Sequence, residues 1–207
     1  MRIAIDVNGV LRDTIGKFTR VYESYLIENN LEIGENNMIV TGETDDFVYE
    51  MTTPITSLTL TDFFKFKDEE EYLKFMYEEF PMQIFGHAGS SENNTFNLLN
   101  DFYLDQRVEN EIMIISEEVG KGKPATLFFL SKFGCLIEKI RFYSKTTKDS
   151  IWDDIDILLT SNPELLLNYP TEKIVIKFET EYNKTTDSKY TIRSLSELTD
   201  IFKQIKK

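Results

Sequence analysis

Polar side chains follow four short apolar runs of the sequence. In chain order they are Asp6 and Asn8, then Ser116, then Ser144 and Lys145, and finally Thr160, Ser161 and Asn162. They supply carboxylate, amide, hydroxyl and ammonium groups, which are the kinds of side chain that bind ligands and transfer protons. These residues are therefore the first candidates for a functional site.

A parallel β-sheet is the element that would position these residues. Each apolar run is too hydrophobic to face water, and helical patterns separate the runs, which is typical of strands covered by helices on both faces. The predicted strands are 2–6, 111–115, 137–143, 156–160 and 173–178, and the predicted helices are 13–30, 68–80, 92–103, 124–133, 163–167 and 194–206. The polar stretch 181–189 is predicted to be a flexible loop.

The fold class that follows is α/β, a three-layer doubly wound parallel sheet with an inserted, mainly helical cap. Residues 1–12 and 109–207 are predicted to form the core domain, because strand and helix alternation restarts near Asn110. Residues 13–108 are too long for an ordinary crossover and are predicted to form the cap. Strand ends gather in such a fold, so we expect Asp6, Ser116, Lys145 and Thr160 to converge in one cleft.

The order of these features resembles the haloacid dehalogenase (HAD) superfamily of phosphohydrolases, and especially its nucleotidase-like members with a cap after the first strand. The family's first motif, Asp-X-Asp-Gly, is similar to Asp6-Val-Asn8-Gly9. Ser116 matches its second motif, and Lys145 matches its third, with Lys148 as an alternative. The resemblance implies that Asp6 is the nucleophile, and that Ser116 and Lys145 bind phosphate.

Two departures from the family pattern bear on activity. Asn8 stands in place of the general acid and has no titratable proton. The carboxylates of the fourth motif are replaced by Thr160, Ser161 and Asn162. A Mg²⁺ ion held by Asp6 and by the main-chain carbonyl of Asn8 would therefore be bound weakly, because Mg²⁺ prefers anionic oxygen ligands.

The resemblance and its departures lead to two hypotheses. The first is a HAD-like domain with a degenerate phosphatase site, catalytically impaired, that serves as a binding or structural module. The alternative is an active metal-dependent phosphohydrolase, similar to 5'-nucleotidases, that acts on a small phosphomonoester. A small phosphorylated ligand and a protein assembly partner are the partners that we expect.

Composition excludes other classes of function. The 207 residues carry 23 Lys and Arg against 36 Asp and Glu, a net charge of -13, which disfavours binding to nucleic acid or to membrane surfaces. No signal peptide or membrane-spanning stretch is predicted, so we expect a soluble, cytoplasmic protein. A single cysteine, Cys135, precludes an internal disulfide, and the single histidine, His87, is interpreted as structural.

Overall fold

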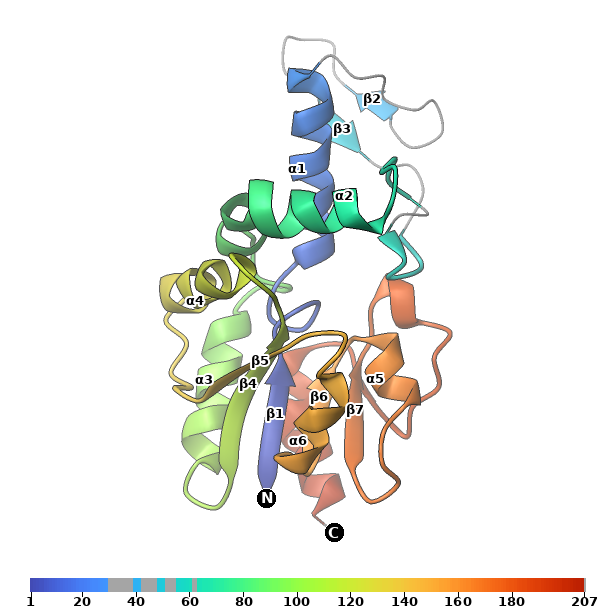
Figure 1. Ribbon diagram of the computed structural model, residues 1–207. Coiled ribbons are helices and arrows are strands. Elements are labelled where there is room, and N and C mark those ends of the chain that lie inside the picture. Colours follow the sequence, from blue (N-terminus) through green and yellow to red (C-terminus); the bar gives the residue numbers. More distant parts are fainter. Residues whose placement is uncertain (30–38, 42–47, 51–54, 61–62, 207) are drawn as a thin grey trace.

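A six-stranded parallel sheet organises the chain, which a computed structural model describes at residues 1–29, 39–41, 48–50, 55–60 and 63–206 (Figure 1). The strand order is β5-β4-β1-β6-β7-β8, and each neighbouring pair is parallel. The strands are β1 (Arg2–Asp6), β4 (Glu111–Glu117), β5 (Ile140–Tyr143), β6 (Ile157–Thr160), β7 (Ile174–Phe178) and β8 (Tyr190–Ile192). Because the chain continues on one side of β1 to β4 and on the other side to β6, the end of β1 lies at the point where the strand order reverses.

Helices cover both faces of this sheet, which confirms the predicted three-layer α/β fold. On one face lie α3 (Thr95–Gln106), α4 (Gly122–Lys132) and α6 (Leu198–Ile205), whose buried residues form one cluster with Ile5 and Ile114. On the other face lie the 3-10 helix η4 (Lys148–Asp153) and α5 (Pro163–Leu167), which pack against Ala4 and Leu158. Alternate residues of β1 therefore enter different clusters, as the two-residue period of a strand requires.

The inserted segment, taken here as the described residues between Thr14 and Gly86, places its helices α1 and α2 beyond the carboxyl ends of the strands (Figure 1). The segment contains α1 (Thr14–Glu28), the two short strands β2 (Ile39–Thr41) and β3 (Val48–Glu50), and α2 (Glu69–Lys74). Its core is aromatic and centres on Phe18, which is fully buried and contacts Phe64 edge-on at 4.7 Å between ring centroids. The aromatic residues of this segment thus serve packing to a large extent.

The predicted helix at 68–80 forms but changes its type along its length. Helix α2 ends at Lys74 and continues directly as the wider π-helical turn η2 (Phe75–Glu79). A second π-helical turn, η3 (Met82–Gly86), follows Pro81, which cannot donate a backbone hydrogen bond and so separates the two turns.

Helix α3 packs against the sheet although it falls within the predicted cap. Its buried residues Phe96, Leu99 and Phe102 belong to the same cluster as the strands, and the Phe102 ring contacts Phe202 of α6. The division of the chain at residues 12/13 and 108/109 stays a prediction, and the packing of α3 favours a shorter cap.

The segment after β7 differs from the flexible loop predicted at 181–189. Residues Glu181–Asn183 form the 3-10 helix η5, and Asn183 is fully buried. The following strand, β8, was not predicted, because three residues are too short for their periodicity to be recognised. The predicted helix at 194–206 does form, as the 3-10 turn η6 (Leu195–Glu197) followed by α6, and Ser194 and Glu197 form a capping box at its start.

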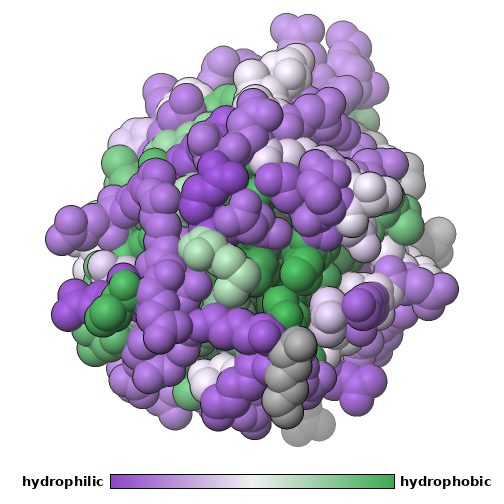
Figure 2. Space-filling view, turned by 90° about the horizontal axis from the view of Figure 1, so that it is seen from below, coloured by the Kyte–Doolittle hydropathy of each residue, from purple (hydrophilic) through white to green (hydrophobic). Residues whose placement is uncertain are grey.

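The start of β1 and the end of α6 lie at the amino ends of the strands, on the side of the sheet opposite α1 and α2 (Figure 1). Seen from that end, the surface is mostly hydrophilic, with apolar residues gathered in a small central area (Figure 2). Within the described residues, no helix has the length and apolar character needed to cross a membrane.

Candidate active site

The carboxyl end of β1 places Asp6 in a buried polar environment. Asp6 is 1% exposed, and its Oδ2 accepts a hydrogen bond of 2.7 Å from the Thr160 hydroxyl at the end of β6. Burial raises the pKa of Asp6 to about 7, although the Thr160 hydrogen bond acts in the opposite direction. Its other oxygen, Oδ1, has no hydrogen-bond partner among the described residues. Asp6 and Thr160, two of the four residues expected to share a cleft, are therefore in direct contact.

The side chain of Asn8 is held by four neighbours, Arg12, Thr14, Ser116 and Glu118. Its Oδ1 accepts hydrogen bonds from the Arg12 guanidinium and from the Thr14 hydroxyl, each at 2.7 Å. Its Nδ2 donates to the Ser116 hydroxyl over a longer 3.4 Å. The amide therefore points its two ends at fixed partners, and it offers no acidic proton.

A buried ion pair adjoins Asn8. Arg12 and Glu118 lie 2.5 Å apart, and both side chains are fully buried. Arg12 also donates to the Thr126 hydroxyl at 2.7 Å and to the Phe85 carbonyl at 3.2 Å, so it links the core to η3 of the inserted segment. Burial raises the pKa of Glu118, while Arg12 favours its charged form.

The main-chain carbonyl of Asn8 faces the end of β6. The Ser161 hydroxyl donates to this carbonyl at 2.8 Å, and the Tyr182 hydroxyl lies 2.7 Å from the same Ser161 oxygen. Gly9 follows with a φ of 73°, and a Cβ there would lie only 1.9 Å from the Tyr182 hydroxyl. Glycine is thus required at this turn for both conformation and space.

The remaining predicted residues, Ser116 and the two lysines, differ in their burial and in their partners. Ser116 is fully buried and donates to Glu118 at 3.3 Å, so it joins the Asn8 cluster. Lys145 is 70% exposed and forms an ion pair with Glu69 of α2. Its alternative, Lys148, pairs with Glu164 at 2.7 Å. No contact recorded for the described residues joins either lysine to Asp6.

Three further side chains that could do chemistry, Asn162, His87 and Cys135, make contacts that suit a structural role. Asn162 caps α5 by accepting a hydrogen bond from the Glu164 amide at 2.9 Å. His87 is exposed and meets the ring of Phe128, and burial raises the pKa of the Cys135 thiol, which lowers its reactivity. Across the described part of the chain, no group of three or more His, Cys, Asp or Glu residues could hold a metal ion.

Sequence reasoning missed Arg12, Glu118 and Tyr182. A signal existed for Glu118, since it follows the strand end at Ser116 by two residues. Arg12 is a charged residue between the apolar Leu11 and the first residues of a helix, which is also compatible with exposure. Tyr182 lies in a polar stretch with no periodicity, so its contact with Ser161 depends on tertiary structure.

Comparison with known proteins supports the resemblance at the level of the fold. No family model and no curated protein sequence matches the chain. Solved structures do match, among them a haloacid dehalogenase-like family hydrolase from Streptococcus pneumoniae, with a TM-score of 0.62, 11% identity and 97% coverage of both chains. A haloacid dehalogenase-like protein from Agrobacterium tumefaciens matches with a TM-score of 0.60, 11% identity, and coverage of 99% of this chain and 98% of the other.

A third similar structure is YfnB from Bacillus subtilis, which is described as a HAD-hydrolase bound to magnesium. It matches with a TM-score of 0.55, 12% identity and 98% coverage of both chains. These likenesses extend over the core and the inserted segment alike, because almost the whole chain is covered in each. The chain therefore has the fold of the haloacid dehalogenase-like hydrolases.

Proposed function

We propose that the chain is a HAD-like domain with an impaired phosphatase site, which serves as a binding or structural module. The observation that carries this proposal is the Thr160 hydroxyl, 2.7 Å from Asp6, at the strand end where the family resemblance implies carboxylates. A hydroxyl donates to Asp6 and adds no negative charge. At the ends of β1 and β6 the described residues therefore pair the Asp6 carboxylate with a neutral hydroxyl, where metal-dependent phosphoryl transfer would use further carboxylates.

The donor set supports weak magnesium binding. The resemblance assigns the ion to Asp6 and to the Asn8 carbonyl, yet Thr160 and Ser161 already donate to these two groups. The Oδ1 atom of Asp6 is the carboxylate oxygen of this pair of groups that has no hydrogen-bond partner among the described residues. These residues fit Mg²⁺ poorly, and we derive no catalytic step through it.

The surroundings of Asn8 support the loss of acid catalysis. A general acid typically contributes about 10²- to 10⁴-fold to a rate. The Asn8 side-chain amide has no such proton, and Arg12 and Thr14 donate hydrogen bonds to its side-chain oxygen, Oδ1. Arg12 itself is not a substitute acid, because its guanidinium stays protonated at accessible pH.

A small phosphorylated ligand remains the expected binding partner. Lys145 is exposed, and binding a phosphate group would break its ion pair with Glu69. That pair is itself exposed and therefore weak in water. Ser116 is fully buried, so the structure supports Lys145 rather than Ser116 as a ligand contact. A protein assembly partner is also proposed, on the acidic charge of the chain alone.

A hydrolysis screen over phosphomonoesters with Mg²⁺ tests the proposal. We expect the wild-type protein to release phosphate no faster than the Asp6→Asn variant, which keeps the size of the side chain and removes the nucleophile. A wild-type rate well above background that Asp6→Asn abolishes would overturn the proposal. That result would establish the alternative, an active phosphohydrolase similar to 5'-nucleotidases.

One observation favours this alternative. Asp6 Oδ1 has no hydrogen-bond partner among the described residues, so no hydrogen bond to it must be broken before it attacks a phosphorus atom, but it is buried and the surrounding side chains must move to admit a phosphate group. Its raised pKa counts against it at neutral pH, because the carboxylate is the nucleophilic form. Extending the screen to about pH 9, above the pKa of Asp6, separates a protonated nucleophile from an inactive site.

A further inference from the structure

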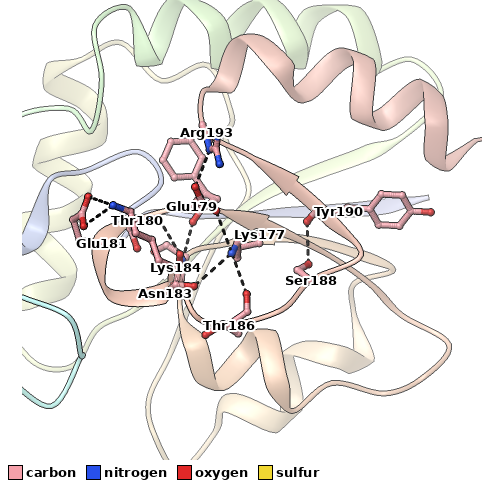
Figure 3. Close-up of polar contacts among 12 residues, drawn as sticks. Lys177, Glu179, Thr180, Glu181, Asn183, Lys184, Thr186, Ser188, Tyr190 and Arg193 are labelled. Atoms are coloured by element: carbon pink, nitrogen blue, oxygen red, sulfur yellow. Dashed lines mark hydrogen bonds and ion pairs between the residues drawn. The ribbon is translucent and has the colours of Figure 1, made fainter.

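A buried lysine fixes the connection between β7 and β8. Lys177 is 4% exposed, and its ammonium lies 3.0 Å from the Thr186 carbonyl, 3.5 Å from the Asn183 carbonyl and 3.4 Å from a carboxylate oxygen of Glu179 (Figure 3). Glu179 also pairs with Arg193 at 2.8 Å. A buried charge requires such partners, so this arrangement holds the connection in a defined position.

Asn183 joins the same connection to the end of β6. Its Nδ2 donates to the Ser161 carbonyl at 2.8 Å and to the Phe178 carbonyl at 2.9 Å, while its Oδ1 accepts from the Thr180 amide at 2.8 Å. The amide is fully buried, and three of its hydrogen-bonding positions are thus satisfied. This places the neighbouring Tyr182 beside Ser161.

The direction of the hydrogen bonds at Ser161 can be assigned. Ser161 has one hydroxyl proton, which it donates to the Asn8 carbonyl. Tyr182 must therefore be the donor in its 2.7 Å contact with Ser161. Burial raises the pKa of Tyr182 to about 12, which keeps this donor proton in place at neutral pH. The result is a relay from the phenol through Ser161 to the Asn8 carbonyl.

We infer that Thr160, Ser161 and Tyr182 take the place of a divalent cation and organise the ends of β1 and β6 without metal. Thr160 donates to Asp6, and the relay from Tyr182 donates to the Asn8 carbonyl, so hydroxyl protons hold both groups that the resemblance assigns to the ion. Tyr182 acts through Ser161 and is a positioning residue. The inference deepens the proposed function and rests on its assignment of an impaired site.

The test combines magnesium titration with removal of the phenol hydroxyl. In ¹H–¹⁵N NMR spectra of the wild-type protein, we expect millimolar Mg²⁺ to leave the amides of Asp6, Asn8 and Ser161 unshifted. Tyr182→Phe should shift the Gly9 amide, which reports on hydrogen bonding to the Asn8 carbonyl, and should lower the thermal unfolding midpoint by about 2–4 °C. Tyr190→Phe is the matched control, because Tyr190 lies nearby on β8 and has no recorded contact with Ser161.

Two results would overturn the inference. One is saturable Mg²⁺ binding to the wild-type protein that shifts the Asp6 and Asn8 amides and disappears in Asp6→Asn. The other is a Gly9 amide that responds to Tyr182→Phe no more than to Tyr190→Phe. If the protein binds Mg²⁺ but does not hydrolyse phosphomonoesters, this inference is wrong and the proposed function stands. If it hydrolyses them without added metal, the proposed function is wrong, and the metal-free organisation of the strand ends is not contradicted.

Discussion

Asp6 and Asn8 lie two residues apart, yet one faces a neutral donor and the other faces an ion pair. Asp6 is a carboxyl group with a hydroxyl donor, Thr160, and it forms no ion pair among the described residues. Asn8 is a neutral amide beside the buried ion pair of Arg12 and Glu118. In both places the net charge that must be buried is small: the ion pair compensates itself, and burial favours the protonated form of Asp6. The comparison indicates that this end of the sheet tolerates little uncompensated charge.

The largest expected effect concerns the charged side of this comparison. Glu118→Gln keeps the shape of the side chain but leaves Arg12 buried without a counter-ion, so we expect the free energy of unfolding to fall by about 3–5 kcal/mol in urea denaturation. The control is Glu111→Gln, since Glu111 forms an ion pair with Lys139 in which its side chain is 49% exposed. That exposed pair should contribute less than about 1 kcal/mol.

A double variant sharpens this prediction. Replacing both partners by apolar residues, Arg12→Met with Glu118→Leu, should recover part of the loss because no buried charge then remains unpaired. If Glu118→Gln costs no more than Glu111→Gln, the ion pair does not stabilise this region.

A second prediction concerns Asp6 and the pH dependence of the free energy of unfolding. The pKa of Asp6 is about 7 in the folded chain, against an ordinary value of 3.8, so the folded state binds more protons across that window. Its contribution to the free energy of unfolding is therefore present below about pH 4 and is lost as the pH rises to about pH 7. We expect a loss on the order of 4 kcal/mol in wild-type protein relative to Asp6→Asn. Parallel stability curves for the two proteins across this range would contradict the raised pKa.

The smallest expected effect concerns the single hydroxyl that faces Asp6. Thr160→Val removes the hydrogen bond to Oδ2, which should lower the free energy of unfolding by about 1–2 kcal/mol. Because this bond favours the ionised form, its loss should also raise the pKa of Asp6, as measured by ¹³C NMR titration of the carboxyl carbon. Thr191→Val on β8, two strands away from Thr160 on β6, is the control. An equal pKa of Asp6 in both variants would show that Thr160 does not tune this carboxyl group.

The sequence determined the sheet and much of the site because these depend on local pattern. Apolar runs and helical spacing specify which residues are strands, and a doubly wound sheet then brings strand ends together. Asp6 and Thr160 meet for this reason although 154 positions separate them. The resemblance of the first motif to the HAD family, read from Asp6 to Gly9, likewise needed no coordinates and is confirmed for the fold.

Tertiary structure alone decided which partner each candidate residue has. Lys145 pairs with Glu69 of the inserted segment, and Tyr182 reaches Ser161 from a stretch predicted to be flexible. Arg12 is fully buried, and the residue after β4, helix α4 and η3 supply its partners Glu118, Thr126 and the Phe85 carbonyl. Such contacts join residues far apart in the chain, and their energy depends on burial and exact geometry, which no periodicity of side chains encodes.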